Sequence, residues 1–319
     1  MIRIPDSEFL QRVEKVQRIM ERKGYDFILC YVNEAEPQFV RYFSDYWPSF
    51  ETAGVIIARQ GPAKLLIGPE SYTYAKDRSR IKDIRQLKAF RESSEPEYPG
   101  KPLGTFTDVI HDCVGKAKVK KFGVAGLPLM TVGVYNALRE SLKEYGEVEI
   151  TKADDLVSSI RMIKTENELN CMRKAAEITK NTMDYVIENV KVGMTETQVV
   201  GLALGKMHEL GAERESYPLW VLTGDGSDQA ISRPRQKRIE KGDLTFFQFG
   251  ARYEGYASSI GRPVVFGKAT DEQKRLINAG YEIQKTMLDF IKAGIPARDV
   301  AKLHIETVKK LGYEEYYVY

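Results

Sequence analysis

Cysteine and histidine are scarce in this chain of 319 residues, which contains three of each. Cys30, Cys113 and Cys171 are odd in number and far apart in the sequence. Such a set argues against a disulfide framework and against a zinc site of the cysteine type. Each histidine stands alone, without a partner at helical spacing. We therefore expect a protein with reduced thiols.

Long apolar runs are also missing, and neither sign of charge dominates. No apolar stretch reaches the roughly 20 residues of a membrane helix, and the N-terminal sequence MIRIPDSEF lacks the apolar segment of a signal peptide. Lys and Arg number 48 and Asp and Glu 45, which gives a net charge of +3 and no basic footprint for nucleic acid. These absences predict a cytoplasmic protein with no membrane and no nucleic-acid partner.

The first half of the chain alternates strand and helix patterns. Apolar residues recur at helical spacing up to Gly24, and a run over 26–32 is typical of a buried strand. This alternation predicts an α/β domain over 1–153, followed by a second domain over 154–319, and hence a mixed α/β fold of the α+β type. The other predicted elements of the first domain are strands over 53–58, 64–67, 84–90 and 121–125, and helices over 71–76, 106–114 and 132–145.

The second domain begins with a predicted helix over 156–179 and then repeats itself. Residues 191–211 and 292–312 both begin with Lys-x-Gly and both end, after a predicted helix, in Leu-Gly, at a constant offset of 101 residues. Such self-similarity predicts two halves related by a pseudo-two-fold axis. Because the second copy is followed by a short segment only, we expect the rest of its half to lie beyond Tyr319.

A stretch from Leu222 to Gly267 has the pattern of a small sheet. Its strand over 244–249 is nearly all apolar, as expected for a strand that is buried on both faces. Gln248 and Ser259 interrupt this pattern, and a buried polar side chain costs about 1–3 kcal/mol unless it finds a partner, a ligand or a water. The predicted strands are 244–249, 256–260 and 263–266, and the predicted hairpin loop is 250–255.

This stretch resembles the aminopeptidase P, prolidase and creatinase family of pita-bread hydrolases through its sequence EKGDLTFFQFGARYEGYASSIGRPVVFG. The resemblance implies a creatinase-like domain over 1–153, a pita-bread domain over 154–319 and a homodimer. The first two aspartate metal ligands of the family fall on Gln248 and Ser259. The residues that match the family pattern are Gly242, Asp243, Leu244, Gly250, Ala251, Gly255, Tyr256, Ser258 and Arg262.

Other functional residues of the family are also affected. The substrate-side histidine that the family carries upstream falls on Ile231 or Ser232. The remaining histidine and two glutamates of the family are expected beyond Tyr319. The resemblance therefore implies the family's fold more directly than its usual chemistry.

What the resemblance implies for function follows from the two lost carboxylates. A two-metal centre needs hard carboxylate ligands, whereas Gln248 and Ser259 offer only neutral oxygens. Creatinase, a branch that hydrolyses a C–N bond without metal, also has uncharged residues at both positions. We expect a hydrolase of a C–N bond in a small amide, amidine or dipeptide-like substrate, with no metal cofactor. Two alternatives remain open: a Xaa-Pro peptidase dependent on manganese, cobalt or zinc, and a non-catalytic dimeric binding protein.

The residues expected to form the site lie in or near the same strands. We expect Arg262 to be buried beside Gln248 and Ser259, where it would face a substrate anion or an oxyanion, or to form a structural ion pair. An arginine pair, Arg233 and Arg235, would grip a substrate carboxylate or lie in a solvated turn. The candidate catalytic residues are Gln248, Ser259, Ser232 and Arg262, and the candidate substrate-binding residues are Arg233, Arg235, Tyr217, Trp220 and Tyr256.

Overall fold

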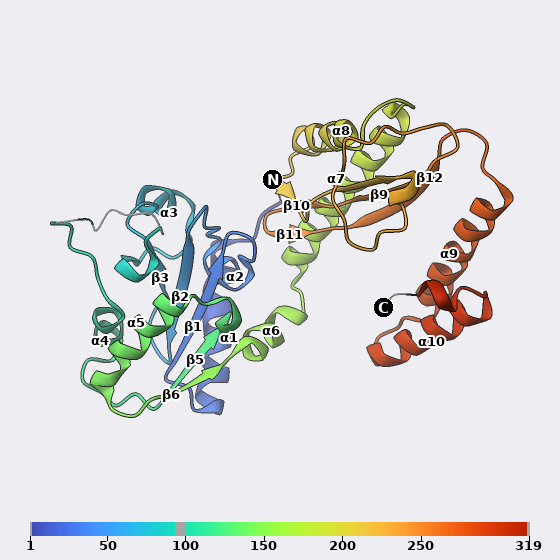
Figure 1. Cartoon of the computed structure of the whole chain (residues 1–319). Helices are drawn as coiled ribbons and strands as arrows, with labels where there is room; N and C mark the ends of the chain where they lie inside the picture. The colour runs from blue at the N-terminus through green and yellow to red at the C-terminus, as the bar shows by residue number, and fades with distance from the viewer. Residues whose placement is uncertain (1, 93–97, 99, 318–319) are drawn as a thin grey trace. The chain divides into compact units, whose positions relative to one another are not determined.

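The structure, a computed structural model, describes residues 2–92, 98 and 100–317. The chain forms two compact units, Met1–Cys171 and Met172–Tyr319 (Figure 1). No helix in this described part of the chain is long and apolar enough to cross a membrane.

The first unit is built on a six-stranded sheet with the strand order β4-β3-β2-β1-β5-β6. β2 pairs with β1 and with β3 in antiparallel fashion, whereas the pairs β1–β5, β3–β4 and β5–β6 are parallel. The hairpin predicted over 53–58 and 64–67 is confirmed as β2 and β3. The strands are β1 (Phe27–Asn33), β2 (Thr52–Ala58), β3 (Lys64–Ile67), β4 (Ile84–Gln86), β5 (Lys121–Ala125) and β6 (Glu149–Lys152).

Helices cover both faces of this sheet. Residues 27–32 of β1 are fully buried, because positions 28, 30 and 32 face one hydrophobic core and positions 27, 29 and 31 face another. The first core includes residues of α1 (Asp6–Lys23), α2 (Gln38–Ser44), α3 (Tyr72–Arg78) and α6 (Asp154–Met162). The second core includes residues of α4 (Phe106–Val114) and α5 (Val132–Leu142). The described residues of the unit also form three short 3-10 helices: η1 (Lys88–Phe90), η2 (Leu127–Leu129) and η3 (Lys143–Tyr145).

Three sequence expectations for this region are wrong in detail. The helix predicted over 132–145 ends at Leu142 and is followed by η3. The strand predicted over 84–90 ends at Gln86 and is followed by η1. The single helix predicted over 156–179 is divided into α6 and α7 (Glu166–Asn189). A capping box starts the second of these helices: Thr165 N donates to the Glu168 carboxylate at 2.7 Å, and Glu168 N donates to Thr165 Oγ1 at 3.2 Å.

The second unit contains α8 (Glu196–Glu209) and two small sheets, with the orders β12-β9-β8 and β11-β10-β7. Residues of α7, α8 and both sheets share one hydrophobic core. The strands are β7 (Arg214–Glu215), β8 (Trp220–Thr223), β9 (Leu244–Phe249), β10 (Ala251–Tyr253), β11 (Tyr256–Ala257) and β12 (Ile260–Val265). The remaining elements are η4 (Gly224–Gly226), α9 (Asp271–Phe290), α10 (Ala297–Lys310) and η5 (Glu314–Tyr316).

Strand β9 is buried on one face only, which corrects the expectation of burial on both faces. Thr245, Phe247 and Phe249 are fully buried, whereas the alternate residues of the strand are only partly buried. Phe247 and Phe249 pack in the core that contains residues of α7 and α8. Because side chains alternate along a strand, Gln248 faces away from that core.

Half of the loop predicted over 250–255 is strand, because residues 251–253 form β10. β10 ends at Tyr253, which pairs with Tyr256 of β11 across a two-residue turn. The turn residues Glu254 and Gly255 have φ angles of 49° and 83°, as a tight hairpin turn that matches the twist of its strands requires. The strand predicted over 256–260 is shortened to β11 (Tyr256–Ala257), and the strand predicted over 263–266 begins earlier, as β12 (Ile260–Val265).

The internal repeat is confirmed in the backbone of its two copies. α8 begins at Glu196 and ends at Glu209, and α10 begins and ends 101 residues later, at Ala297 and Lys310. The glycines before the two helices both have φ of 92°, and those after them have φ of 95° and 79°. Only glycine adopts such angles without strain, so the matching glycines set the same turns in both copies.

We expect truncation of the β9 core residue Phe247 to destabilise the second unit. Phe247→Ala should lower the free energy of unfolding by about 3–5 kcal/mol, since it leaves a cavity under the sheet. Arg262→Ala, which changes the exposed cross-strand neighbour of Phe247, is the matched control and should cost less than about 0.5 kcal/mol. Urea unfolding followed by fluorescence measures both, and equal effects of the two substitutions would contradict this packing.

A buried carboxyl group, that of Glu51, lies in the first unit. Glu51 is 5% exposed, and Tyr46 Oη donates a hydrogen bond to its Oε1 at 2.6 Å. Its Oε2 has no hydrogen-bond partner among the residues that the structure describes. Burial raises the pKa of Glu51 above its usual value. The folded protein therefore favours the protonated form more than the unfolded chain does.

This raised pKa predicts a stability that depends on pH. The protonated carboxyl stabilises the folded state at low pH, and this contribution is lost as pH rises through the folded-state pKa. Glu51→Gln imitates the protonated form and should raise the Tm at pH 7, with a difference that shrinks toward the ordinary carboxyl pKa of about 4.3. Calorimetric melting between pH 4 and pH 8 tests this, and a lower Tm for the variant at pH 7 would refute it.

Candidate functional site

Gln248 lies on the open face of the sheet that contains β9. In the register of this sheet, Trp220 of β8 and Gly261 of β12 flank Gln248 on either side. Directly opposed residues point to the same face, so the indole of Trp220 shares a face with the amide of Gln248. Both side chains are partly exposed.

Tyr217 joins this pair to Ser259. The Tyr217 and Trp220 rings are in edge contact, with centroids 6.3 Å apart. Tyr217 Oη donates to the carbonyl of Phe249 at 3.0 Å and lies 2.7 Å from Ser259 Oγ. The structure thus brings together four of the residues that the sequence singled out: Tyr217, Trp220, Gln248 and Ser259.

The hydrogen-bond directions define what Ser259 can do. A phenol has a single O–H, and Tyr217 gives it to Phe249, so Tyr217 accepts the hydroxyl hydrogen of Ser259. Neutral tyrosine is not a general base, and Ser259 is therefore not activated as a nucleophile by this contact. Its oxygen keeps lone pairs for a donor, such as a substrate N–H, at the exposed surface.

Hydrogen bonds that the sequence did not reveal anchor the segment before Ser259. Ser258 Oγ donates to the carbonyl of Ala175 on α7 at 2.8 Å and lies 2.5 Å from Thr179 Oγ1. Ser216 Oγ donates to the Ser258 carbonyl at 2.9 Å. Gly250 is required beside them, since a Cβ there would lie 2.2 Å from the Ser258 carbonyl oxygen. The hydrogen-bond partners Ala175, Thr179 and Ser216 lie between 42 and 83 residues away from Ser258 in the sequence, which is why the local pattern gave no signal for them.

Arg262 does not lie where the sequence predicted. It is exposed, and it pairs with Phe247 rather than with Gln248. Its side chain is therefore on the opposite face of the sheet from Gln248, and Nη1 donates to the carbonyl of Gly261 at 2.8 Å. The expectation of a buried arginine beside Gln248 and Ser259 is wrong, because the intervening residue Gly261 occupies the shared face.

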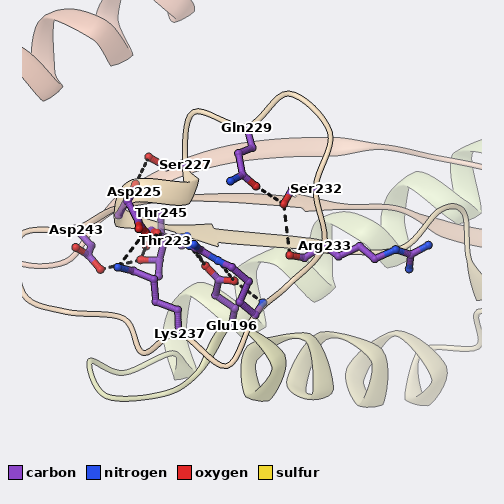
Figure 2. Close-up of polar contacts among 12 residues, drawn as sticks. Glu196, Thr223, Asp225, Ser227, Gln229, Ser232, Arg233, Lys237, Asp243 and Thr245 are labelled. Atoms are coloured by element: carbon purple, nitrogen blue, oxygen red, sulfur yellow. Dashed lines mark hydrogen bonds and ion pairs between the residues drawn. The ribbon is translucent and has the colours of Figure 1, made fainter.

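Arg233 and Arg235, expected to grip a substrate carboxylate or to lie in a solvated turn, differ in their surroundings. Arg235 donates to the buried carboxylate of Glu196 through its backbone N at 2.5 Å and through Nη2 at 3.0 Å. Thr223 N donates to the same carboxylate at 2.9 Å. Arg233 is exposed and extends away from the group that contains Glu196 (Figure 2). Arg235 therefore has a structural role, in which it ties the loop before β9 to α8.

Ser232 lies in the loop that follows η4, and Tyr256 lies in β11. Ser232 Oγ bonds to the side chain of Gln229 within the same loop (Figure 2). Tyr256 belongs to β11, in the second of the two small sheets. Any role of these two residues in substrate binding stays a prediction.

The oxygen atoms at the candidate site do not fit a two-metal centre. Gln248 offers an amide oxygen, and Ser259 and Tyr217 offer hydroxyls, all of them neutral. Bridged divalent ions need carboxylates to balance their charge. Within residues 2–92, 98 and 100–317, no group of three or more His, Cys, Asp and Glu side chains is placed to hold a metal ion.

Comparison with known proteins identifies relatives of both units. Residues 12–163 match the creatinase/prolidase N-terminal domain, and residues 170–319 match metallopeptidase family M24. A Xaa-Pro dipeptidase of Pyrococcus furiosus is 27% identical over 97% of this chain and 80% of its own length. The solved prolidase of Pyrococcus horikoshii has a TM-score of 0.79 at 26% identity, over 97% of this chain and 80% of that chain.

A further solved structure shows that the fold extends to more distant relatives. The prolidase of Thermococcus sibiricus has a TM-score of 0.81 at 22% identity, over 98% of this chain and 80% of that chain. The fold and its duplicated second unit define a protein of the pita-bread class. The chain belongs to the aminopeptidase P, prolidase and creatinase family, with a creatinase/prolidase N-terminal domain and an M24 metallopeptidase domain.

We expect the Glu196 carboxylate to hold the loop before β9 in place. Each of its oxygens accepts a hydrogen bond from a backbone N–H. In Glu196→Gln one of these N–H groups faces the amide NH2, which cannot accept, so the substitution should lower the free energy of unfolding by about 1–3 kcal/mol. The control is Asp225→Asn, because Asp225 bonds to Arg235 from the exposed side of the loop; it should leave the Tm unchanged. Thermal melting and limited proteolysis of the loop test this, and equal effects of the two substitutions would contradict it.

Proposed function

We propose that this protein hydrolyses the C–N bond of a small amide, amidine or dipeptide-like substrate without a two-metal centre. The observation that carries the proposal is the set of neutral polar groups on one sheet face. At the two positions where the resemblance places aspartate ligands, the chain has the Gln248 amide and the Ser259 hydroxyl.

The chemistry of this face favours an amide-like ligand. The Gln248 side chain can donate and accept hydrogen bonds at once, which is the complement of an amide group. The Ser259 oxygen accepts from a further N–H, since its own hydrogen goes to Tyr217. Trp220 and Tyr217 supply apolar aromatic surface beside these groups. None of these groups is a general base, so their proposed role is to bind and orient the substrate.

A second candidate function is supported by the relatives. The two Pyrococcus relatives described as Xaa-Pro dipeptidases are 27% and 28% identical to this chain. Metal-dependent cleavage of Xaa-Pro dipeptides is therefore the alternative, with manganese, cobalt or zinc as the ion. The neutral oxygens of Gln248 and Ser259 favour the first candidate over this one.

Turnover with and without a chelator distinguishes the candidates. The purified protein is incubated with creatine, small amides and Xaa-Pro dipeptides, in EDTA or in manganese, and the released amine is measured. We expect turnover that EDTA does not reduce, and a loss in kcat/KM of roughly tenfold or more for Gln248→Ala. Lys268→Ala, an exposed change after β12, is the control.

Other outcomes would change the assignment. Turnover of Xaa-Pro dipeptides only in manganese would establish the metallopeptidase alternative. Thermal stabilisation by a substrate with no product would indicate a non-catalytic binding protein. Unchanged kcat/KM for Gln248→Ala would remove Gln248 from the site.

Metal stoichiometry gives an independent test. After incubation with manganese and gel filtration, elemental mass spectrometry should find close to no bound ion in the wild-type protein, because its two ligand positions are neutral. The double variant Gln248→Asp with Ser259→Asp should retain more manganese than the wild type. Two ions per wild-type chain would contradict the proposal.

A further inference from the structure

A cavity of about 580 Å³ lies in the first unit, whereas the residues of the candidate site belong to the second unit. It is formed by η1 with Arg91, by the residues that start α4, and by one face of α5. Cavities of this size hold small organic ligands. The lining used below includes Lys88, Arg91, Gly133, Val134, Ala137 and Ser141.

Two cationic side chains, each of which also has an interaction within the protein, lie at one end of the cavity. Lys88 and Arg91 line it, together with Thr131 and Gly133 at the start of α5. The first N–H groups of a helix have no partner within the helix and favour an anion. At α5 the Val134 N–H already donates to Thr131 Oγ1 at 3.4 Å, which leaves the N–H groups of Val132 and Gly133 for a ligand. A Cβ on Gly133 would meet no atom within 4 Å, so the backbone there is open to a ligand. The start of α4 is less available, because the Asp108 carboxylate already accepts from Thr105 N at 2.7 Å.

The other end of the cavity contains a buried hydroxyl. Ser141 is 8% exposed, and it has no hydrogen-bond partner among the described residues, unlike Ser44, which bonds to the carbonyl four residues earlier in its helix. Ser141 lies on the same face of α5 as Val134 and Ala137, at helical spacing, and all three line the cavity. The Ser141 hydroxyl is reached from the cavity rather than fully enclosed by protein, so a polar group of a bound molecule can form a hydrogen bond with it.

The spacing and charges of the lining restrict the ligand. Gly133 and Ser141 are separated by eight residues of helix, or roughly 12 Å along its axis. Between them the wall is apolar, with Val134 and Ala137. Glu140 lines the far end and is paired with Lys143 at 2.7 Å, which disfavours a second negative charge there.

From these features we infer a binding site for a small organic monocarboxylate in the first unit. The carboxylate lies at the start of α5 with Lys88 and Arg91. An apolar body of about eight carbons runs along Val134 and Ala137, since the helix rises roughly 12 Å over this span. An uncharged polar group at the far end bonds to Ser141. This site is independent of the function proposed for the second unit.

Octanoate is the probe for the anionic end, and octanamide is its uncharged analogue. Isothermal titration calorimetry of the purified protein should show octanoate binding, with octanamide weaker by roughly fivefold or more, as expected when a charge-assisted contact is lost. Arg91→Gln should weaken octanoate to a similar extent. Arg139→Gln is the matched control, because it removes a positive charge from α5 outside the cavity lining and should have no effect.

8-Hydroxyoctanoate tests the far end. It should bind more tightly than octanoate to the wild type, and Ser141→Ala should abolish that gain without changing octanoate affinity. Ala137→Phe, which fills the cavity, should prevent binding of both, with circular dichroism confirming that the variant is folded. Absence of octanoate binding in the millimolar range, equal affinity for octanamide, or binding that survives Ala137→Phe would overturn the proposal.

Discussion

The alternation of side chains along β9 is the constraint on which the second unit depends. Phe247 and Phe249 enter the core shared with α7 and α8, and this burial fixes the register of the strand. Gln248 is then held on the opposite face, beside Trp220. A shift of one residue would bury the amide and expose both phenylalanines. The same interaction that stabilises the unit therefore also determines which groups a substrate can meet.

Much of the fold could be predicted from the sequence because its signals are local. Gly193 and Gly294 mark the repeat, and the hairpin of β2 and β3 follows from its apolar runs and turn. The capping box of Thr165 and Glu168 is predictable from the sequence and is confirmed, whereas the division of the helix predicted over 156–179 is not, because the apolar stripe continues on both sides of Thr165. β9 was predicted as a strand but its exposed face was not, since Leu244 and Phe246 are as apolar as their buried neighbours.

The candidate site was predictable only in part, because some of its contacts join residues that are far apart in the sequence. Gln248 and Ser259 stand out as polar interruptions, and Tyr217 and Trp220 as aromatic residues near a turn. Arg262 was misplaced because the sequence does not give its register against Phe247. The partner of Arg235, Glu196, lies 39 residues earlier, and no local pattern connects the two. The role of a residue whose contacts are distant in the sequence cannot be predicted from a local pattern.

The burial of Cys30 at the centre of β1 gives this protein an internal reporter. Burial raises the pKa of the Cys30 thiol well above its usual range, and its side chain is fully enclosed between the strands and helices of the first unit. The reactive thiolate is thus withheld from oxidants and alkylating reagents for as long as β1 stays paired with β2 and β5. When modification of the exposed thiol is faster than reclosing, the rate at which Cys30 is modified equals the rate at which the central strands open. When reclosing is faster, the rate equals the open fraction times the intrinsic reactivity of the thiol. In both cases Cys30 reports the local opening of the sheet.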